Sequence, residues 1–140
     1  MEIRRLSTEA EILSTYPVMS QLRSHVDGGE YLSTVRRMET ADGYRLAAGF
    51  DEETVCCVAG YRVGEFLAYG KILYVDDLVT DEAARSRDFG AMMIGWLSEE
   101  ARRNGCDQLH LDSGVQRHAA HRFYFREGMK IMNYHFSKSL

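Results

Sequence analysis

The sequence has only one proline in 140 residues, and no apolar run approaches the ~20 residues that a membrane-spanning helix needs. No proline-rich linker therefore divides the chain, and we expect one domain over residues 1–140. The opening residues, MEIRRLSTEAEIL, lack the apolar block of a secretory signal. These absences predict a cytoplasmic protein with no membrane partner.

Cysteine is scarce and positive charge is not in excess. Cys56, Cys57 and Cys106 have no metal-like CxxC spacing, so we interpret them as structural thiols. A net charge of −4 argues against a nucleic-acid partner, because such binding neutralises phosphates with cations. His118 and His121 are three residues apart, but no HExxH or matching Cys/His set accompanies them. We therefore predict no metal site.

The most informative stretch is residues 72–105. Its first part is apolar and partly β-branched, which predicts a buried strand ending near Val79. From Phe89 the apolar residues follow helical spacing, and Asn104-Gly105 is a typical helix end. The turn between strand and helix carries two arginines beside the free N–H groups of a helix start. That combination predicts a site for a phosphorylated ligand.

The rest of the chain also alternates between strand and helix patterns. The sequence predicts strands over 2–6, 44–50, 54–62, 106–113 and 129–136, helices within 12–22 (interrupted near Pro17), 30–39 and 117–127, and a turn at 64–65. This order is typical of a mixed α/β fold.

The turn resembles the acetyl-coenzyme A signature of the GNAT superfamily of N-acetyltransferases, Arg/Gln-x-x-Gly-x-Gly/Ala between a strand and a helix. Here it reads Arg85-x-x-Asp88-x-Gly90, with aspartate in place of the first glycine. A second segment, AAHRFYFREGMKI, is similar to the family's Ala-x-x-Phe-Tyr-x-x-x-Gly-Phe pattern. The resemblance covers about residues 44–137. It implies a GNAT-like, mostly antiparallel mixed sheet flanked by helices, with a central β-α-β-α-β core that binds acetyl-CoA.

The resemblance also implies how acetyl-CoA, the co-substrate, would be held. Its pyrophosphate would meet the turn, and its pantetheine arm would pair with the strand like an added strand. The implied cofactor-binding residues are Leu78, Val79, Thr80, Arg85, Ser86, Arg87, Asp88, Phe89, Gly90 and Ala91. Asp88 has two interpretations: a tolerated variation with its charge turned outward, or a change that weakens cofactor binding.

Three residues are candidates for catalysis. Tyr124 matches the tyrosine that in many family members lies beside the thioester sulfur and protonates the thiolate; the alternative is a packed aromatic residue. Asp76 and Asp77 lie where relatives often carry an acid that deprotonates the amine. The alternative is charge that protects a strand edge. Neighbouring residues of a regular strand face opposite sides, but a bulge shifts that alternation, so both acids stay candidates.

The implied function is transfer of an acetyl group to a primary amine by direct attack in a ternary complex, because no cysteine is placed as an acyl carrier. The partner would be a small-molecule amine or a peptide amine. Glu65 and Tyr31, with the loop 24–31, are candidates for contacting it. Relatives are commonly dimers, so a homodimer is an option for this chain.

Two other functions stay open at this stage. A non-catalytic acyl-CoA-binding sensor is compatible with Asp88 and with Arg117, which stands where many relatives have asparagine. A dinucleotide-binding enzyme is disfavoured, because no GxGxxG follows a first strand.

Overall fold

The computed structural model describes residues 1–140, which form two compact units. The first unit, Met1–His110, holds the sheet and most of the helices. The second, Leu111–Leu140, holds one helix and the C-terminal segment. None of the helices is both long and apolar enough to cross a membrane.

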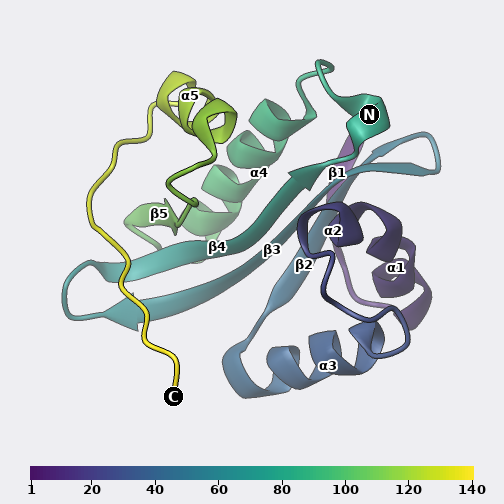
Figure 1. Ribbon diagram of the computed structural model, residues 1–140, viewed down its shortest axis with the longest axis horizontal. Helices are drawn as coiled ribbons and strands as arrows, with labels where there is room; N and C mark the ends of the chain where they lie inside the picture. The colour runs from purple at the N-terminus through teal and green to yellow at the C-terminus, as the bar shows by residue number, and fades with distance from the viewer. The chain divides into compact units, whose positions relative to one another are not determined.

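A five-stranded sheet organises the first unit (Figure 1). Its strands are β1 (Glu2–Leu6), β2 (Arg45–Asp51), β3 (Thr54–Phe66), β4 (Gly70–Thr80) and β5 (Gln108–Leu111), and they lie in that order. The first four strands form three antiparallel pairs. β5 lies beside β4 and follows it through a helix, and its last residue belongs to the second unit. The predicted mixed, mostly antiparallel sheet is confirmed.

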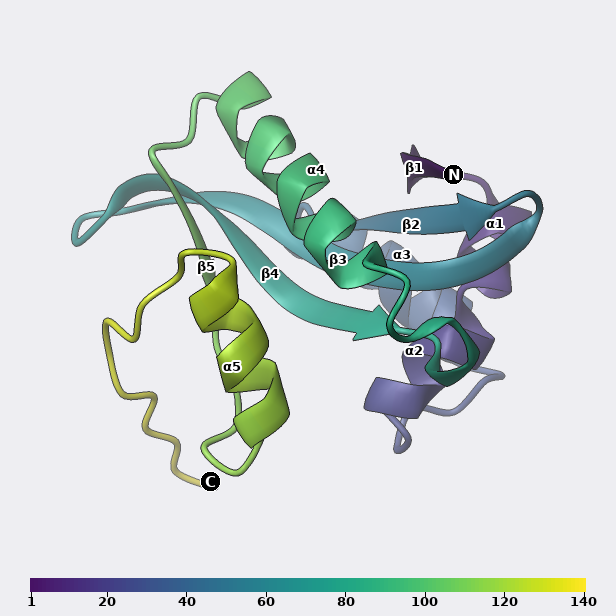
Figure 2. The same cartoon turned by 90° about the horizontal axis from the view of Figure 1, so that it is seen from above.

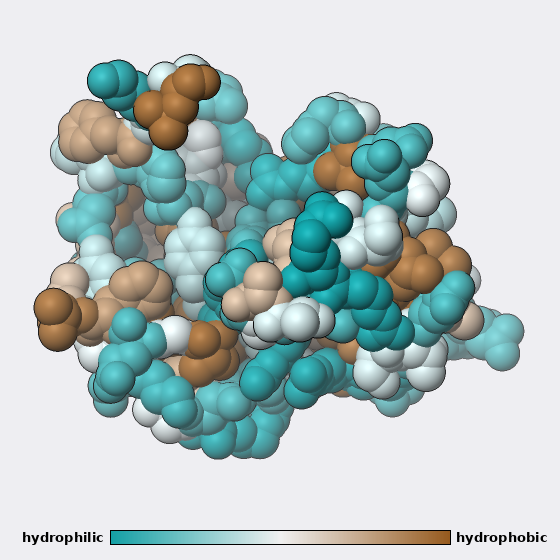
Figure 3. Space-filling model, turned by 90° about the horizontal axis from the view of Figure 1, so that it is seen from below, coloured by the Kyte–Doolittle hydropathy of each residue, from teal (hydrophilic) through white to brown (hydrophobic).

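Helices cover both faces of this sheet (Figure 2). Helices α1 (Glu9–Ser14), α2 (Tyr16–Leu22) and α3 (Tyr31–Asp42) lie on one face, and α4 (Phe89–Arg103) lies on the other. Residues 56–61 of β3 are consequently all buried, as expected for a strand that is covered on both sides. On the face that Figure 3 presents, hydrophobic residues form small separate patches among hydrophilic ones.

The start of α1 is fixed by a reciprocal pair of hydrogen bonds. The Thr8 hydroxyl accepts from the Glu11 N–H at 3.2 Å, and the Glu11 carboxylate accepts from the Thr8 N–H at 3.1 Å. The same carboxylate pairs with Arg4 of β1. α1 ends at Ser14, and α2 begins one residue after Thr15 with Pro17 in its first turn, where proline is tolerated. The interruption predicted near Pro17 is confirmed.

Helix α4 follows the predicted apolar stripe. Phe89, Met93 and Leu97 are buried, and Gly105 ends the helix region with a φ of 72° that glycine adopts without steric cost. A short 3-10 helix, η1 (Glu82–Ala84), connects β4 to the turn that precedes α4.

Two sequence predictions are wrong. The turn expected at 64–65 is part of β3, which runs on to Phe66, and the chain reverses over residues 67–69. Gly64 therefore lies within a strand, where its small size is tolerated. The strand expected over 129–136 is not formed. After helix α5 (His118–Arg126), residues 127–140 contain no helix or strand. Alternating apolar residues make a strand only where a neighbouring strand supplies hydrogen bonds.

Glu11 gives the fold a measurable dependence on acid. Arg4 lowers the pKa of Glu11 from 4.5 to about 2, with help from the N–H groups of Thr8 and Ser7. The stabilisation is therefore complete above pH 4.5 and is lost as the pH falls toward 2. We expect Glu11→Gln to lower the free energy of unfolding at pH 7 by up to about 1 kcal/mol. Urea titrations should show this difference shrinking between pH 4.5 and 2.5.

The matched control is Glu9→Gln, because Glu9 lies in the same first turn and is not part of the Arg4 pair. A Glu11→Gln deficit that stays constant down to pH 2.5 would contradict the assignment of this pair.

Candidate active site

Strand β4 contains a β-bulge at the two neighbouring acids. Asp77 lies opposite Gly60 of β3 and Val75 lies opposite Tyr61, so Asp76 is the extra residue. A bulge interrupts the alternation of a regular strand. The orientation of the two acids is therefore set by their contacts, and each carboxylate meets its own arginine.

Asp77 receives one hydrogen bond on each carboxylate oxygen. The Arg23 Nε donates to its Oδ1 at 2.8 Å, and the Tyr44 hydroxyl donates to its Oδ2 at 2.6 Å. Arg23 also donates from Nη2 to the backbone oxygen of Asp76 at 2.8 Å. Arg23 stands directly after α2, so this contact ties the loop between α2 and α3 to the bulge of β4.

The Tyr44 hydroxyl reaches Asp77 because residue 60 has no side chain. A Cβ at Gly60 would collide with that hydroxyl and lie 2.6 Å from the Asp77 Oδ2. Burial raises the pKa of Tyr44 well above its usual value, and the nearby Asp77 charge adds to this effect. Tyr44 therefore stays protonated and acts as a donor to Asp77.

Asp76 is held by Arg62 of β3 through two bonds, at 3.0 Å from Nε and 2.6 Å from Nη2. Burial raises the pKa of Asp76, while Arg62 works in the opposite direction. A carboxylate with a raised pKa is better suited to accept a proton near neutral pH than an exposed one. Asp76 has this property.

The turn before α4 has the backbone of an anion site. Helix α4 has no side-chain hydrogen bond at its N-cap, so its first N–H groups lack that partner. The N-cap is Asp88, which has a left-handed conformation with φ 62°. Glycine adopts this conformation most easily, and glycine is the residue that the GNAT signature has here. The backbone thus keeps the shape of the signature although the side chain differs.

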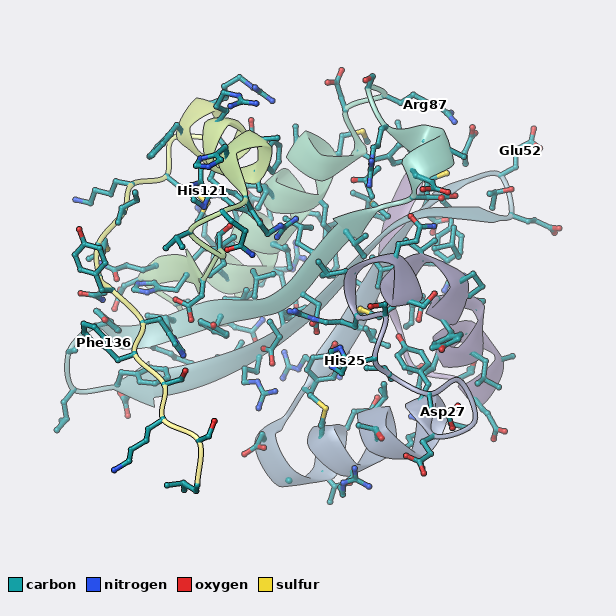
Figure 4. The ribbon with its side chains drawn as sticks, viewed as in Figure 1. His25, Asp27, Glu52, Arg87, His121 and Phe136 are labelled. Atoms are coloured by element: carbon teal, nitrogen blue, oxygen red, sulfur yellow. The ribbon has the colours of Figure 1, made fainter.

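One arginine of this turn is engaged at the surface. Arg87 forms an ion pair with Asp51 at the end of β2, and its guanidinium lies 5.2 Å from the centre of the Phe89 ring. Figure 4 shows Arg87 at the same end of the unit as Glu52, in the β2–β3 turn. A phosphate group that approaches the turn must compete with Asp51 for Arg87.

The outer edge of β4 is covered for only part of its length. β5 has four residues against eleven in β4, and the Asp107 N–H just before β5 donates to the Lys71 oxygen near the start of β4. Leu78, Val79 and Thr80 pair with β3 on their other side. β5 is too short to reach the whole edge, so backbone groups of β4 are left for an extended ligand to pair with.

The second unit contains Tyr124, on α5. Its ring lies 5.4 Å from that of Phe123, measured between ring centres. Burial raises the pKa of Tyr124, and a hydrogen bond with Arg117 lowers it in part. The phenol is therefore protonated at neutral pH, which is the state that a proton donor needs.

The two predicted substrate contacts, Glu65 and Tyr31, both lie in the first unit. Glu65 is exposed near the end of β3 and lies opposite Lys71 of β4 in the strand register. Lys71 is about 16 Å along β4 from Asp76. Tyr31 is only 4% exposed, and its hydroxyl lies 2.7 Å from the Thr15 hydroxyl. Burial raises the pKa of Tyr31 and the Asp77 charge adds to this effect, so Tyr31 lies within electrostatic range of the bulge, whereas Glu65 lies far along the strand.

Arg23, Tyr44 and Arg62 were missed by the sequence analysis. Arg23 and Asp77 are 54 residues apart, and Tyr44 and Asp77 are 33 apart. No local pattern connects such pairs. Gly60, a glycine inside a buried strand, is the one local signal, because it indicates that another group approaches closely. No group of three or more metal-binding side chains occurs in the structure.

Together, the edge of β4 and the uncapped start of α4 bring backbone hydrogen-bonding groups near a pair of acids. Comparison with known proteins gives the class. The model of the family described as "Acetyltransferase (GNAT) family" matches residues 10–129 of this chain. A Bacillus subtilis protein named uncharacterized N-acetyltransferase YhdJ is 32% identical over 139 residues, covering 99% of this chain and 98% of that protein.

Two further similarities are informative. The aminoalkylphosphonate N-acetyltransferase of Salmonella typhimurium is 36% identical over 66 residues, which is 47% of this chain and 43% of that protein. An aminoglycoside N-acetyltransferase, solved in complex with CoA, has the same fold with a TM-score of 0.86 at 10% identity, covering 99% of this chain and 93% of that one. The chain belongs to the GNAT family of acetyltransferases.

The close approach at Gly60 can be tested by one substitution at two positions. Gly60→Ala places a Cβ against Tyr44 and Asp77, so we expect it to lower the free energy of unfolding by about 1–3 kcal/mol. Gly95→Ala is the control, because Gly95 lies in α4 with no atom within 4 Å of the added Cβ. There we expect a gain of about 0.5–1 kcal/mol. Chemical denaturation measures both, and equal effects would contradict this geometry.

Asp88→Gly tests the turn. Glycine adopts the left-handed conformation without strain, so we expect a gain in stability of about 1 kcal/mol. The substitution also removes a negative charge from the turn, so we expect tighter coenzyme A binding. The control is Glu52→Gly, which has a φ of 54° but lies outside the turn. It should gain stability without a change in affinity. Calorimetry measures the dissociation constant of coenzyme A for each variant. An unchanged dissociation constant for Asp88→Gly would mean that this position is neutral for binding.

Proposed function

We propose that the protein transfers an acetyl group from acetyl-CoA to a primary amine by direct attack in a ternary complex. The observation that carries this proposal is the β4 edge at Leu78–Thr80, which leads through η1 into the uncapped start of α4. The edge offers backbone groups to the pantetheine arm, and the turn 85–91 offers N–H groups to the pyrophosphate. Membership of the GNAT family supports the assignment.

The proposed reaction requires one bond to form and one to break. The nitrogen of the neutral amine attacks the thioester carbonyl carbon, and the carbon–sulfur bond of the tetrahedral intermediate then breaks. The nitrogen loses a proton, and the thiolate of CoA gains one. We assign the proton acceptor to Asp76, directly or through water, because its pKa is raised by burial. We assign the proton donor to Tyr124.

Asp77 has a different role in this proposal. Its two oxygens connect separate parts of the chain, because they accept from Arg23, after α2, and from Tyr44, before β2, whereas both oxygens of Asp76 accept from Arg62 alone. We therefore assign Asp77 to holding the loop after α2 against the bulge, and Asp76 to the proton transfer.

The acceptor is proposed as a small-molecule amine or a peptide amine. The name of the Salmonella relative describes an amine that carries an acidic group, and we include that class among the acceptors for this chain. We further propose that residues 1–140 act as one domain in the cytoplasm, since the family match at 10–129 crosses the boundary between the two units. Light scattering would test the homodimer that we propose with it.

Tyr124→Phe tests the proton donor. We expect kcat for thiol release from acetyl-CoA to fall about 10²-fold or more, with little change in the KM for acetyl-CoA. The control is Tyr134→Phe, because Tyr134 is an exposed tyrosine of the same unit. Since burial raises the pKa of Tyr124, the wild type should keep its donor protonated at neutral pH and in mild alkali. Unchanged turnover in Tyr124→Phe would remove this residue as the donor.

The same assay separates the enzyme from a sensor. Asp88 and the Arg87–Asp51 pair both reduce the positive charge available at the turn, which is the observation that favours a binding domain without turnover. Coenzyme A binding in calorimetry, with no thiol release on a broad amine panel, would favour the sensor over the enzyme.

A further inference from the structure

Two ion pairs lie side by side at the bulge of β4. Arg23 pairs with Asp77, and Arg62 pairs with Asp76. The four side chains come from β3, β4 and the loop after α2, which continues through His25 and Asp27 in Figure 4. The Asp76 and Asp77 side chains are 20% and 13% exposed, so charges of both signs stand at the edge of solvent.

The two arginines differ in how many acidic partners they have. Arg62 has two acidic partners, Asp76 and Asp42, and its guanidinium also lies over the Tyr44 ring. Arg23 has one acidic partner and one neutral backbone oxygen, and its side chain is 40% exposed. These contacts use two of the five N–H groups of the guanidinium, so three are left for another acceptor.

We propose that the amine acceptor carries an oxyanion, a carboxylate or a phosphonate, a short chain away from its nitrogen, and that Arg23 binds this group. The inference rests on the proposed function and specifies its substrate class. Arg23 fits the task because it is already fixed at Asp77, and an arginine fork matches the oxygens of a carboxylate or phosphonate. The amine of the same molecule then lies toward Asp76, which takes its proton.

The charges at the bulge favour such an acceptor over a diamine. A diamine of equal length would place its second ammonium beside the Arg23 guanidinium, and like charges at this range repel. An alkylamine with no second charged group would leave the three N–H groups of Arg23 bonded only to water. An acceptor with both signs of charge meets an opposite charge at each end.

The experiment compares four acceptors of similar length in the thiol-release assay: n-propylamine, 1,3-diaminopropane, 3-aminopropionate and 2-aminoethylphosphonate. We expect kcat/KM to be at least tenfold higher for one or both of the anionic acceptors than for n-propylamine. In Arg23→Gln the KM of the preferred anionic acceptor should rise about tenfold to a hundredfold, the usual range for a hydrogen bond to a charged group. The KM of n-propylamine should rise less than that of the anionic acceptor, because n-propylamine has no anion for Arg23 to bind.

Two variants separate binding from general damage. Arg23→Lys keeps the charge but loses the fork, so its KM for the anionic acceptor should lie between those of the wild type and Arg23→Gln. Arg102→Gln removes an arginine charge from the surface of α4, where Arg102 pairs with Glu99, and should behave as the wild type. Thermal melts identify any variant that is unfolded.

The outcomes are distinct. A preference for n-propylamine or the diamine, or an equal rise in KM for all acceptors in Arg23→Gln, would overturn the inference and leave the proposed function standing. If no acceptor reacts, the proposed function fails, and calorimetry with 2-aminoethylphosphonate and 3-aminopropionate decides the inference alone. Binding to the wild type that weakens at least tenfold in Arg23→Gln supports it, and no binding to the wild type overturns it.

Discussion

The rest of the site depends on one extra residue in β4. Because Asp76 is bulged, the pairing of β4 with β3 shifts by one residue between Val75 and Asp77. In a regular antiparallel pair, neighbouring acids would face opposite sides of the sheet, and one of them would face the apolar core or a covering helix. Because of the bulge, each carboxylate forms an ion pair with an arginine. Gly60, on the opposite strand, leaves the space through which Tyr44 reaches the second acid.

Charge compensation explains why this bulge is tolerated in a partly buried strand. A buried carboxylate without a partner costs several kcal/mol, whereas a well-bonded pair approximately offsets the loss of hydration. Asp76 and Asp77 each have a guanidinium partner, and Asp77 also has a phenol. The compensation is incomplete at Asp76, where burial outweighs Arg62 and raises the pKa. A carboxylate whose pKa is raised in this way is a stronger proton acceptor than one that is fully compensated.

Local patterns predicted the parts of this structure that are local. The helical spacing from Phe89 predicted α4, whereas the left-handed backbone of Asp88 was not predicted. The bulge was anticipated as a reason that strand alternation does not decide between Asp76 and Asp77. The long-range contacts could not be predicted, because nothing near Arg23 indicates a partner 54 residues away. The strand at 129–136 failed for the same physical reason: its alternation describes one strand and says nothing of the neighbour that must pair with it.

Backbone amides and positively charged side chains usually contribute to anion binding together, but in the turn before α4 the amides are available and the side-chain charges are nearly cancelled. Its backbone has the signature conformation and an uncapped helix start, whereas its side chains are nearly balanced, with Arg87 paired to Asp51 and a carboxylate at position 88. Amide groups act over short distances and are fixed by the fold, while exposed charges act over about 10 Å and are screened by salt. Affinity for a phosphorylated ligand at this turn should therefore come mainly from the amides. Binding by amides depends on the conformation of residue 88, so for such a ligand the backbone of Asp88 matters more than its charge.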